Sequence, residues 1–130
     1  IEGITPQFHD ERCTRNGHYG YIFHYQEAAF GGLPIKRFIE ALRAEGIPDQ
    51  ASYPPLHAMD VFTSGAYRQR LCGDQAAADH AFLRESFPNT MRAAWETVWI
   101  PQYALLGDEQ DMHEIADAIC KIQRYAQELM

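Results

Sequence analysis

The stretch HYGYIFHY, residues 18–25, alternates between the two sides of an extended chain. Tyr19, Tyr21, Phe23 and Tyr25 fall on one side, and smaller or more polar residues fall on the other. Alternation with a period of two, rich in aromatic residues, predicts a β-strand. We interpret the aromatic stripe as the core-facing side of a sheet rather than a stacking surface for a cofactor, because aromatic side chains dominate protein cores.

A helix is predicted after this strand, beyond a turn at residues 28–33 that contains two consecutive glycines. Pro34 is well suited to the first helical position, and Gly46 suits a left-handed cap at the end. The apolar residues between them recur at helical spacing: Ile35, Phe38, Ile39 and Leu42. A short extended piece then begins at Ile47.

Further elements are predicted in the second half of the chain. An alanine-rich helix runs from Gln75 to about Glu85, with Asp74 as its N-cap. Pro88 begins a short helix that continues to about Trp95. Residues 97–100 form a strand that is stopped by Pro101.

The last predicted helix opens at Gly107-Asp108, with Asp108 as its cap and further acidic residues in its first turn. One apolar stripe follows it: Met112, Ile115, Ala116, Ile119, Ile122, Ala126 and Leu129. About three short strands with helices packed on one side predict an α+β domain. So few strands favour a mostly antiparallel or mixed sheet.

Composition narrows the class of protein. The 130 residues have the length of a single domain, and their 46% hydrophobic content can fill one core. A net charge of −7 argues against a nucleic-acid surface, which needs concentrated lysine and arginine. The sequence contains neither an apolar run of about 18 residues nor a signal-peptide pattern. We therefore expect a soluble cytoplasmic protein that acts on small molecules.

The three cysteines are odd in number, widely separated and without a CxxC pair, which suggests neither a zinc site nor a disulfide framework. Reduced thiols are expected in a cytosolic protein. The first residue is Ile1 rather than methionine, so the chain is either processed or a piece of a longer protein. The charged segment from Thr5 to Asn16 is interpreted as an irregular lead-in from a preceding element.

The segment SYPPLH, residues 52–57, contains two consecutive prolines that hold the backbone in an extended path without amide donors. The first proline also keeps Tyr53 out of the helical region. Such a segment costs little entropy to order, and it can hold His57 at a fixed place in the wall of a site. The alternative is a rigid connector whose histidine caps the next turn.

The sequence shows no evident catalytic centre of its own. No pair of its six histidines has the spacing of a helical metal site with a third ligand, and His9-Asp10-Glu11 is interpreted as a solvated cluster. Cys72 beside Gly73 fits a small buried hydrophobe better than a nucleophile. Lys36 and Lys121 both fall off the apolar stripes of predicted helices, so neither has the desolvated setting of a Schiff-base lysine.

Three blocks, taken in order, resemble the C-terminal domain of the DegT/StrS family of fold type I aminotransferases. The first is the strand at residues 19–25 with the helix that ends before Gly46-Ile47. The second, and most specific, is YPPLH at residues 53–57. The third runs from Glu96 to Ile122. The resemblance covers nearly the whole chain from about residue 15.

This resemblance implies a pyridoxal phosphate enzyme that moves an amino group from glutamate or glutamine to a keto sugar or keto cyclitol, as a homodimer with active sites at the subunit interface. It also implies that residues 1–130 form the small C-terminal domain. In the family, the larger N-terminal domain carries the lysine of the internal aldimine and the other cofactor-binding residues, and none of these has a counterpart here. We therefore expect the fragment alone to be inactive.

Within the family pattern, His57 and Tyr53 match the segment that approaches the mouth of the active site, which implies a substrate-binding role for both. The alternative is that His57 orients the segment against the neighbouring domain. Residues 26–33 and 58–72 depart from the family pattern, so the identity of the sugar is left open. Some members of the family lack the lysine and carry out other chemistry, such as dehydration.

Two other classes of function stay open. One is a standalone, non-catalytic ligand-binding or interaction module, which would have a polar surface throughout, whereas a domain cut from a parent would expose apolar surface. The other is a small enzyme that depends on cysteine or histidine, for which the spacing of residues offers no Cys–His pair.

Overall fold

The computed structural model describes residues 1–15, 17–60, 70 and 87–130. The chain divides into two compact units, one made of residues 1–51 with 96–130 and the other of residues 52–95. The predicted helix from Gln75 to Glu85, its cap Asp74 and the thiol of Cys72 lie outside the described residues.

The first unit is built on a sheet of four strands, β1 (Ile4–Pro6), β2 (Gly20–Tyr25), β3 (Gln50–Ala51) and β4 (Thr97–Pro101). Their order is β1-β2-β4-β3, and every neighbouring pair is antiparallel. The predicted α+β class with a short antiparallel sheet is confirmed.

The aromatic stripe of β2 faces the core only along part of its length. Phe23 lies opposite Val98 of β4, and Phe23 and Tyr25 are buried. Tyr21 remains 36% exposed and Tyr19 78% exposed. The expectation of a fully buried stripe is therefore wrong at Tyr19, which precedes the strand and packs against Trp99 instead, with ring centroids 5.2 Å apart.

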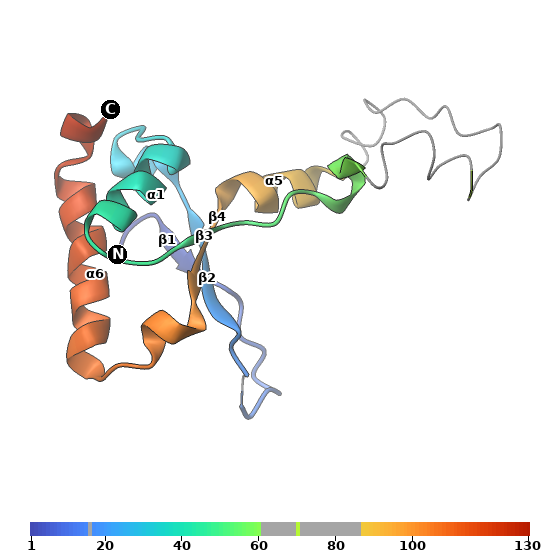
Figure 1. Cartoon of the computed structure of the whole chain (residues 1–130), viewed down its shortest axis with the longest axis horizontal. Coiled ribbons are helices and arrows are strands. Elements are labelled where there is room, and N and C mark those ends of the chain that lie inside the picture. Colours follow the sequence, from blue (N-terminus) through green and yellow to red (C-terminus); the bar gives the residue numbers. More distant parts are fainter. Residues whose placement is uncertain (16, 61–69, 71–86) are drawn as a thin grey trace. The chain divides into compact units, whose positions relative to one another are not determined.

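Helices α1 (Ile35–Ala44) and α6 (Glu109–Arg124) pack over one face of this sheet (Figure 1). Tyr25 stacks on Phe38 of α1 with centroids 4.4 Å apart, and its hydroxyl donates a hydrogen bond of 2.8 Å to the carbonyl of Leu33. Burial, reinforced by the charge of Glu27, raises the pKa of Tyr25. The core cluster comprises Phe23, Tyr25, Phe30, Leu33, Phe38, Leu42, Ile47, Val98, Ile100, Ile119, Ile122 and Ala126.

Helix α1 ends as its sequence predicts. Gly46 adopts φ +84°. The amide of Ile47 donates a hydrogen bond to the carbonyl of Leu42, and the amide of Gly46 donates one to the carbonyl of Arg43. These two bonds form the paired pattern of a Schellman cap. At the other end, the helix starts at Ile35, so Pro34 is the N-cap residue rather than the predicted first helical residue.

Helix α6 begins with the predicted cap. The carboxylate of Asp108 accepts from the amides of Gln110 and Asp111, and the carboxylate of Asp111 accepts from the amide of Asp108. The helix ends at Arg124, and the predicted apolar stripe continues into the 3-10 turn η5 (Ala126–Leu129).

The amino-terminal segment is more ordered than its sequence indicates. Residues 5–16 were expected to be irregular, but β1 pairs with β2 in the register Ile4↔Tyr25 and Pro6↔Phe23. Pro6 lacks an amide donor, which an edge strand tolerates. The prediction failed because the strand is only three residues long.

The remaining short elements complete the described chain. The 3-10 turn η1 (Glu27–Phe30) occupies the predicted turn, and η4 (Gln102–Leu105) follows β4. The second unit contains the 3-10 turn η2 (Leu56–Ala58) and most of helix α5 (Pro88–Glu96), whose start and approximate end were predicted. None of the helices in the described ranges is both long and apolar enough to cross a lipid bilayer.

Candidate functional site

The proline segment leads directly into η2. Residues 52–55 have no regular secondary structure, and Pro55 is buried with φ −54° and ψ 126°, an extended conformation. The amide of Ala58 then donates a 2.9 Å hydrogen bond to the carbonyl of Pro55. The turn that carries His57 is thus anchored at a proline whose φ angle its ring restricts.

His57 is half-buried and lies against an aromatic ring of its own unit. Its imidazole stacks on Phe87, with ring centroids 5.2 Å apart and an angle of 27° between the planes. The Nε2 atom is buried and has no hydrogen-bond partner among the described residues. A buried polar atom left in this state costs about 1–3 kcal/mol, so it is a place where an incoming polar group would gain free energy.

Tyr53, the second predicted site residue, lies on the same segment with its side chain 70% exposed. The N-cap residue of η2 is Pro55, which makes no side-chain capping hydrogen bond. Sequence reasoning missed Phe87, since 30 positions separate it from His57 and no local pattern links the two.

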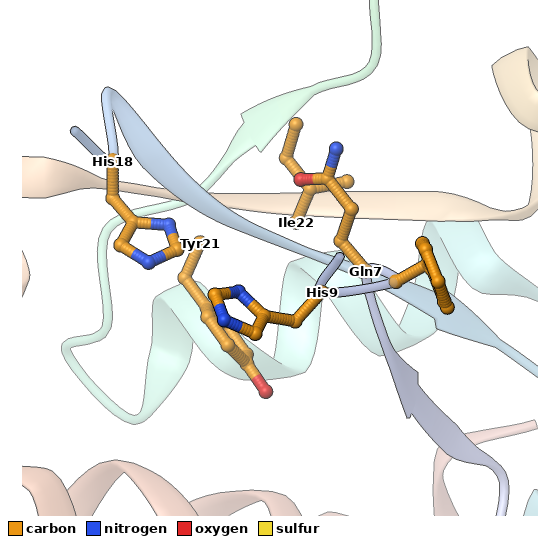
Figure 2. A pocket seen from close by; sticks show the side chains of 6 residues that line it. Gln7, His9, His18, Tyr21 and Ile22 are labelled. Carbon is orange, nitrogen blue, oxygen red and sulfur yellow. The ribbon is translucent and has the colours of Figure 1, made fainter. Parts of the chain in front are cut away.

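A separate shallow hollow, open to solvent and with a volume of about 40 Å³, lies in the first unit (Figure 2). It forms because the amide of Gln7 donates to the carbonyl of Ile22 at 3.2 Å, which extends the pairing of β1 with β2. Two imidazoles, an amide and a phenol line the hollow beside apolar side chains. The lining residues are Gln7, Phe8, His9, His18, Tyr21 and Ile22.

Sequence reasoning did not bring the two histidines of this hollow together, because the β1–β2 pairing that does so involves a strand of only three residues, too short to leave a periodic pattern. Next to the hollow, the guanidinium of Arg12 binds the carboxylate of Asp10 and lowers its pKa. The carboxylate of Asp10 is thus already ion-paired with Arg12. Within the described part of the chain, no group of three or more His, Cys, Asp or Glu residues is placed to hold a metal ion.

Neither lysine is placed to hold a cofactor. Lys36 is exposed on α1. Lys121 is 58% exposed, and its ammonium group lies 2.8 Å from both carboxylate oxygens of Glu45, at the end of α1. A lysine that forms a Schiff base is normally desolvated so that its neutral amine is accessible. These side chains therefore do not fit that role.

Known proteins resemble the chain along nearly its entire length. It is 34% identical over 129 residues, or 98% of the chain, to an L-glutamine:2-deoxy-scyllo-inosose aminotransferase of Streptoalloteichus tenebrarius. It is also 34% identical, over 99% of the chain, to a putative L-glutamine:3-amino-2,3-dideoxy-scyllo-inosose aminotransferase of Streptomyces kanamyceticus. No family model matches the chain.

Among solved structures, 3-amino-5-hydroxybenzoic acid synthase matches 93% of the chain with a TM-score of 0.72 and 25% sequence identity. The chain spans about 30% of the length of the curated relatives and 29% of that solved chain. The resemblance to aminotransferases that the three sequence blocks indicate is therefore confirmed, for a region that is roughly a third of those proteins.

Proposed function

We propose that this chain is the small C-terminal domain of a pyridoxal phosphate-dependent aminotransferase that moves the α-amino group of glutamine to the carbonyl carbon of a keto cyclitol. The observation that carries the proposal is the 34% identity to an L-glutamine:2-deoxy-scyllo-inosose aminotransferase over 98% of the chain. Several further relatives with the same two printed activities support the donor and the class of acceptor.

The cofactor belongs to the remainder of the parent protein in this proposal. Lys36 is exposed and Lys121 is paired with Glu45, so neither lysine fits the covalent attachment of pyridoxal phosphate. The contribution of this chain is instead to present polar groups to the substrate. A homodimer, as in the family pattern, would bring these groups to active sites at the subunit interface.

His57 is the residue that we place against the substrate. Its stacking on Phe87 fixes the plane of the imidazole, while Nε2 keeps a hydrogen-bonding position that no described residue uses. A hydroxyl of the cyclitol or the carboxylate of the donor could each satisfy this atom. Tyr53, exposed four positions earlier, offers a phenol to the same substrate.

The test is an isotope-transfer assay on the full-length protein encoded by the open reading frame that contains this chain. The protein is incubated with pyridoxal phosphate, 2-deoxy-scyllo-inosose and glutamine labelled with ¹⁵N at the α-amino group. We expect the amino cyclitol to gain one mass unit while the donor leaves as its 2-oxo acid.

Glutamine labelled only at the amide nitrogen is the control, and it should give an unlabelled product. Glutamate in place of glutamine shows whether the donor preference extends to it. A full-length protein that forms no amino cyclitol with either donor would contradict the proposed function.

A further inference from the structure

The backbone that carries His57 is held in place by a proline, but the plane of the imidazole is not. Pro55 precedes η2, and the amide of Ala58 donates a 2.9 Å hydrogen bond to its carbonyl. A histidine side chain still rotates about two bonds, and its second torsion, χ2, has a broad preference. The direction in which Nε2 points therefore depends on a contact outside the turn.

Phe87 supplies this contact from a position that is fixed independently. It directly precedes Pro88, the first residue of α5, and a following proline disfavours helical backbone at the residue before it. The carbonyl of Phe87 accepts the first hydrogen bond of the helix, 3.0 Å from the amide of Met91. Two prolines thus hold the backbones of the two residues whose rings stack, one on each side of the pair.

The stacking leaves the edge of the imidazole for hydrogen bonding. The two ring centroids lie 5.2 Å apart with the planes at 27°, so Phe87 covers a face of the imidazole and not the edge where the nitrogens lie. Nε2 is buried and has no hydrogen-bond partner among the described residues. An atom in this setting can bind a substrate group well only when its direction is right, because small errors in position cost large factors in rate.

We propose that Phe87 is a positioning residue of the amino-transfer reaction. It acts through His57, by setting the direction in which Nε2 meets the substrate, and makes no substrate contact of its own. The inference rests on the proposed function, in which His57 binds the substrate. It adds a second residue, 30 positions further along the chain, on which this contact depends.

The test is a double-mutant cycle on kcat/KM in the full-length protein, with Phe87→Leu, His57→Phe and the two combined. Leucine keeps apolar bulk at position 87 but has no flat face to orient the imidazole. We expect Phe87→Leu alone to lower kcat/KM about 3- to 10-fold, the size expected for loss of an aromatic pair, and for the same substrate that His57→Phe affects. Added to His57→Phe, it should lower kcat/KM by less than about twofold, because the nitrogen that it orients is already absent.

Two control variants separate the flat ring from general packing. Phe87→Tyr keeps the ring and should retain kcat/KM within about twofold of wild type. Tyr125→Leu removes a ring of similar exposure, 45% against 44% for Phe87, at the end of α6, and should also leave kcat/KM unchanged. Thermal unfolding of each variant verifies that it folds, and Phe87→Met replaces Phe87→Leu if the leucine variant does not.

Wild-type kinetics in Phe87→Leu, or an equal loss with and without His57→Phe, would overturn the positioning role. A Phe87→Tyr variant as impaired as Phe87→Leu would overturn it as well. Either result in a protein whose wild type transfers the amino group leaves the proposed function intact. A wild-type protein without amino transfer contradicts the proposed function itself, and the positioning role falls with it.

Discussion

At the scale of single residues, His57 combines two contacts that can be separated by substitution. The ring packs on Phe87, and the Nε2 atom is a buried polar group without a described partner. Phenylalanine at position 57 would preserve a flat ring for stacking and remove both nitrogens. If the side chain serves only to pack, His57→Phe should leave kcat/KM unchanged. If Nε2 binds substrate, the same substitution should lower kcat/KM.

We expect His57→Phe in the full-length protein to lower kcat/KM for amino transfer about 10- to 100-fold. A hydrogen bond to a charged group, worth about 1.5–3 kcal/mol, accounts for a loss of this size. Steady-state kinetics with glutamine and the keto cyclitol varied in turn show which substrate loses the contact. Wild-type kinetics in His57→Phe would leave only the packing role.

The control for this substitution is His113→Phe. His113 lies on α6 with a side chain 68% exposed, 3.7 Å from Glu109, and it belongs to neither candidate site. Its replacement should leave kcat/KM within about twofold of the wild-type value, since surface substitutions away from a site have small effects.

At the scale of secondary-structure elements, the capping box of α6 is the clearest local determinant of stability. Asp108→Ala removes the acceptor for two backbone amides, so we expect a loss of about 1 kcal/mol in the free energy of unfolding. Urea denaturation followed by circular dichroism measures this change. Asp117→Ala, on an exposed position inside the same helix, should change the stability by less than half as much.

The ends of the helices could be predicted because each is encoded within a few residues. Gly46 at positive φ and Asp108 at an N-cap each leave a signal that local chemistry explains. Strand β1 left no such signal, because three residues carry no periodicity and their pairing with β2 is decided by tertiary contacts. The same limit explains Tyr19, whose contact with Trp99 joins distant positions.

At the scale of the whole molecule, the two candidate sites differed in how far the sequence could define them. The segment that carries His57 could be predicted from Pro54 and Pro55 alone, because a proline restricts only its own backbone and that of the residue before it. The hollow at Gln7, His9 and His18 depends on two segments that meet only through the β1–β2 pairing. A pattern read along one segment therefore cannot reveal it.

The proposal that a longer parent protein supplies the cofactor-binding lysine can be tested through Lys36 and Lys121. We expect Lys36→Arg and Lys121→Arg together to leave the amino-transfer activity of the full-length protein within about twofold of wild type. Lys36 is exposed, and arginine at position 121 can retain the ion pair with Glu45. The visible absorbance of the bound cofactor should also be unchanged in the double variant.

A loss of activity together with loss of the bound-cofactor absorbance would place the cofactor-binding lysine inside this chain, contrary to the exposed setting of both side chains. A loss of thermal stability with the absorbance retained would point only to the Lys121–Glu45 pair that joins α6 to the end of α1. Because exposed pairs contribute about 0–1 kcal/mol, even that change should be small. Retained activity and absorbance would place the cofactor-binding lysine outside residues 1–130, as the proposed function requires.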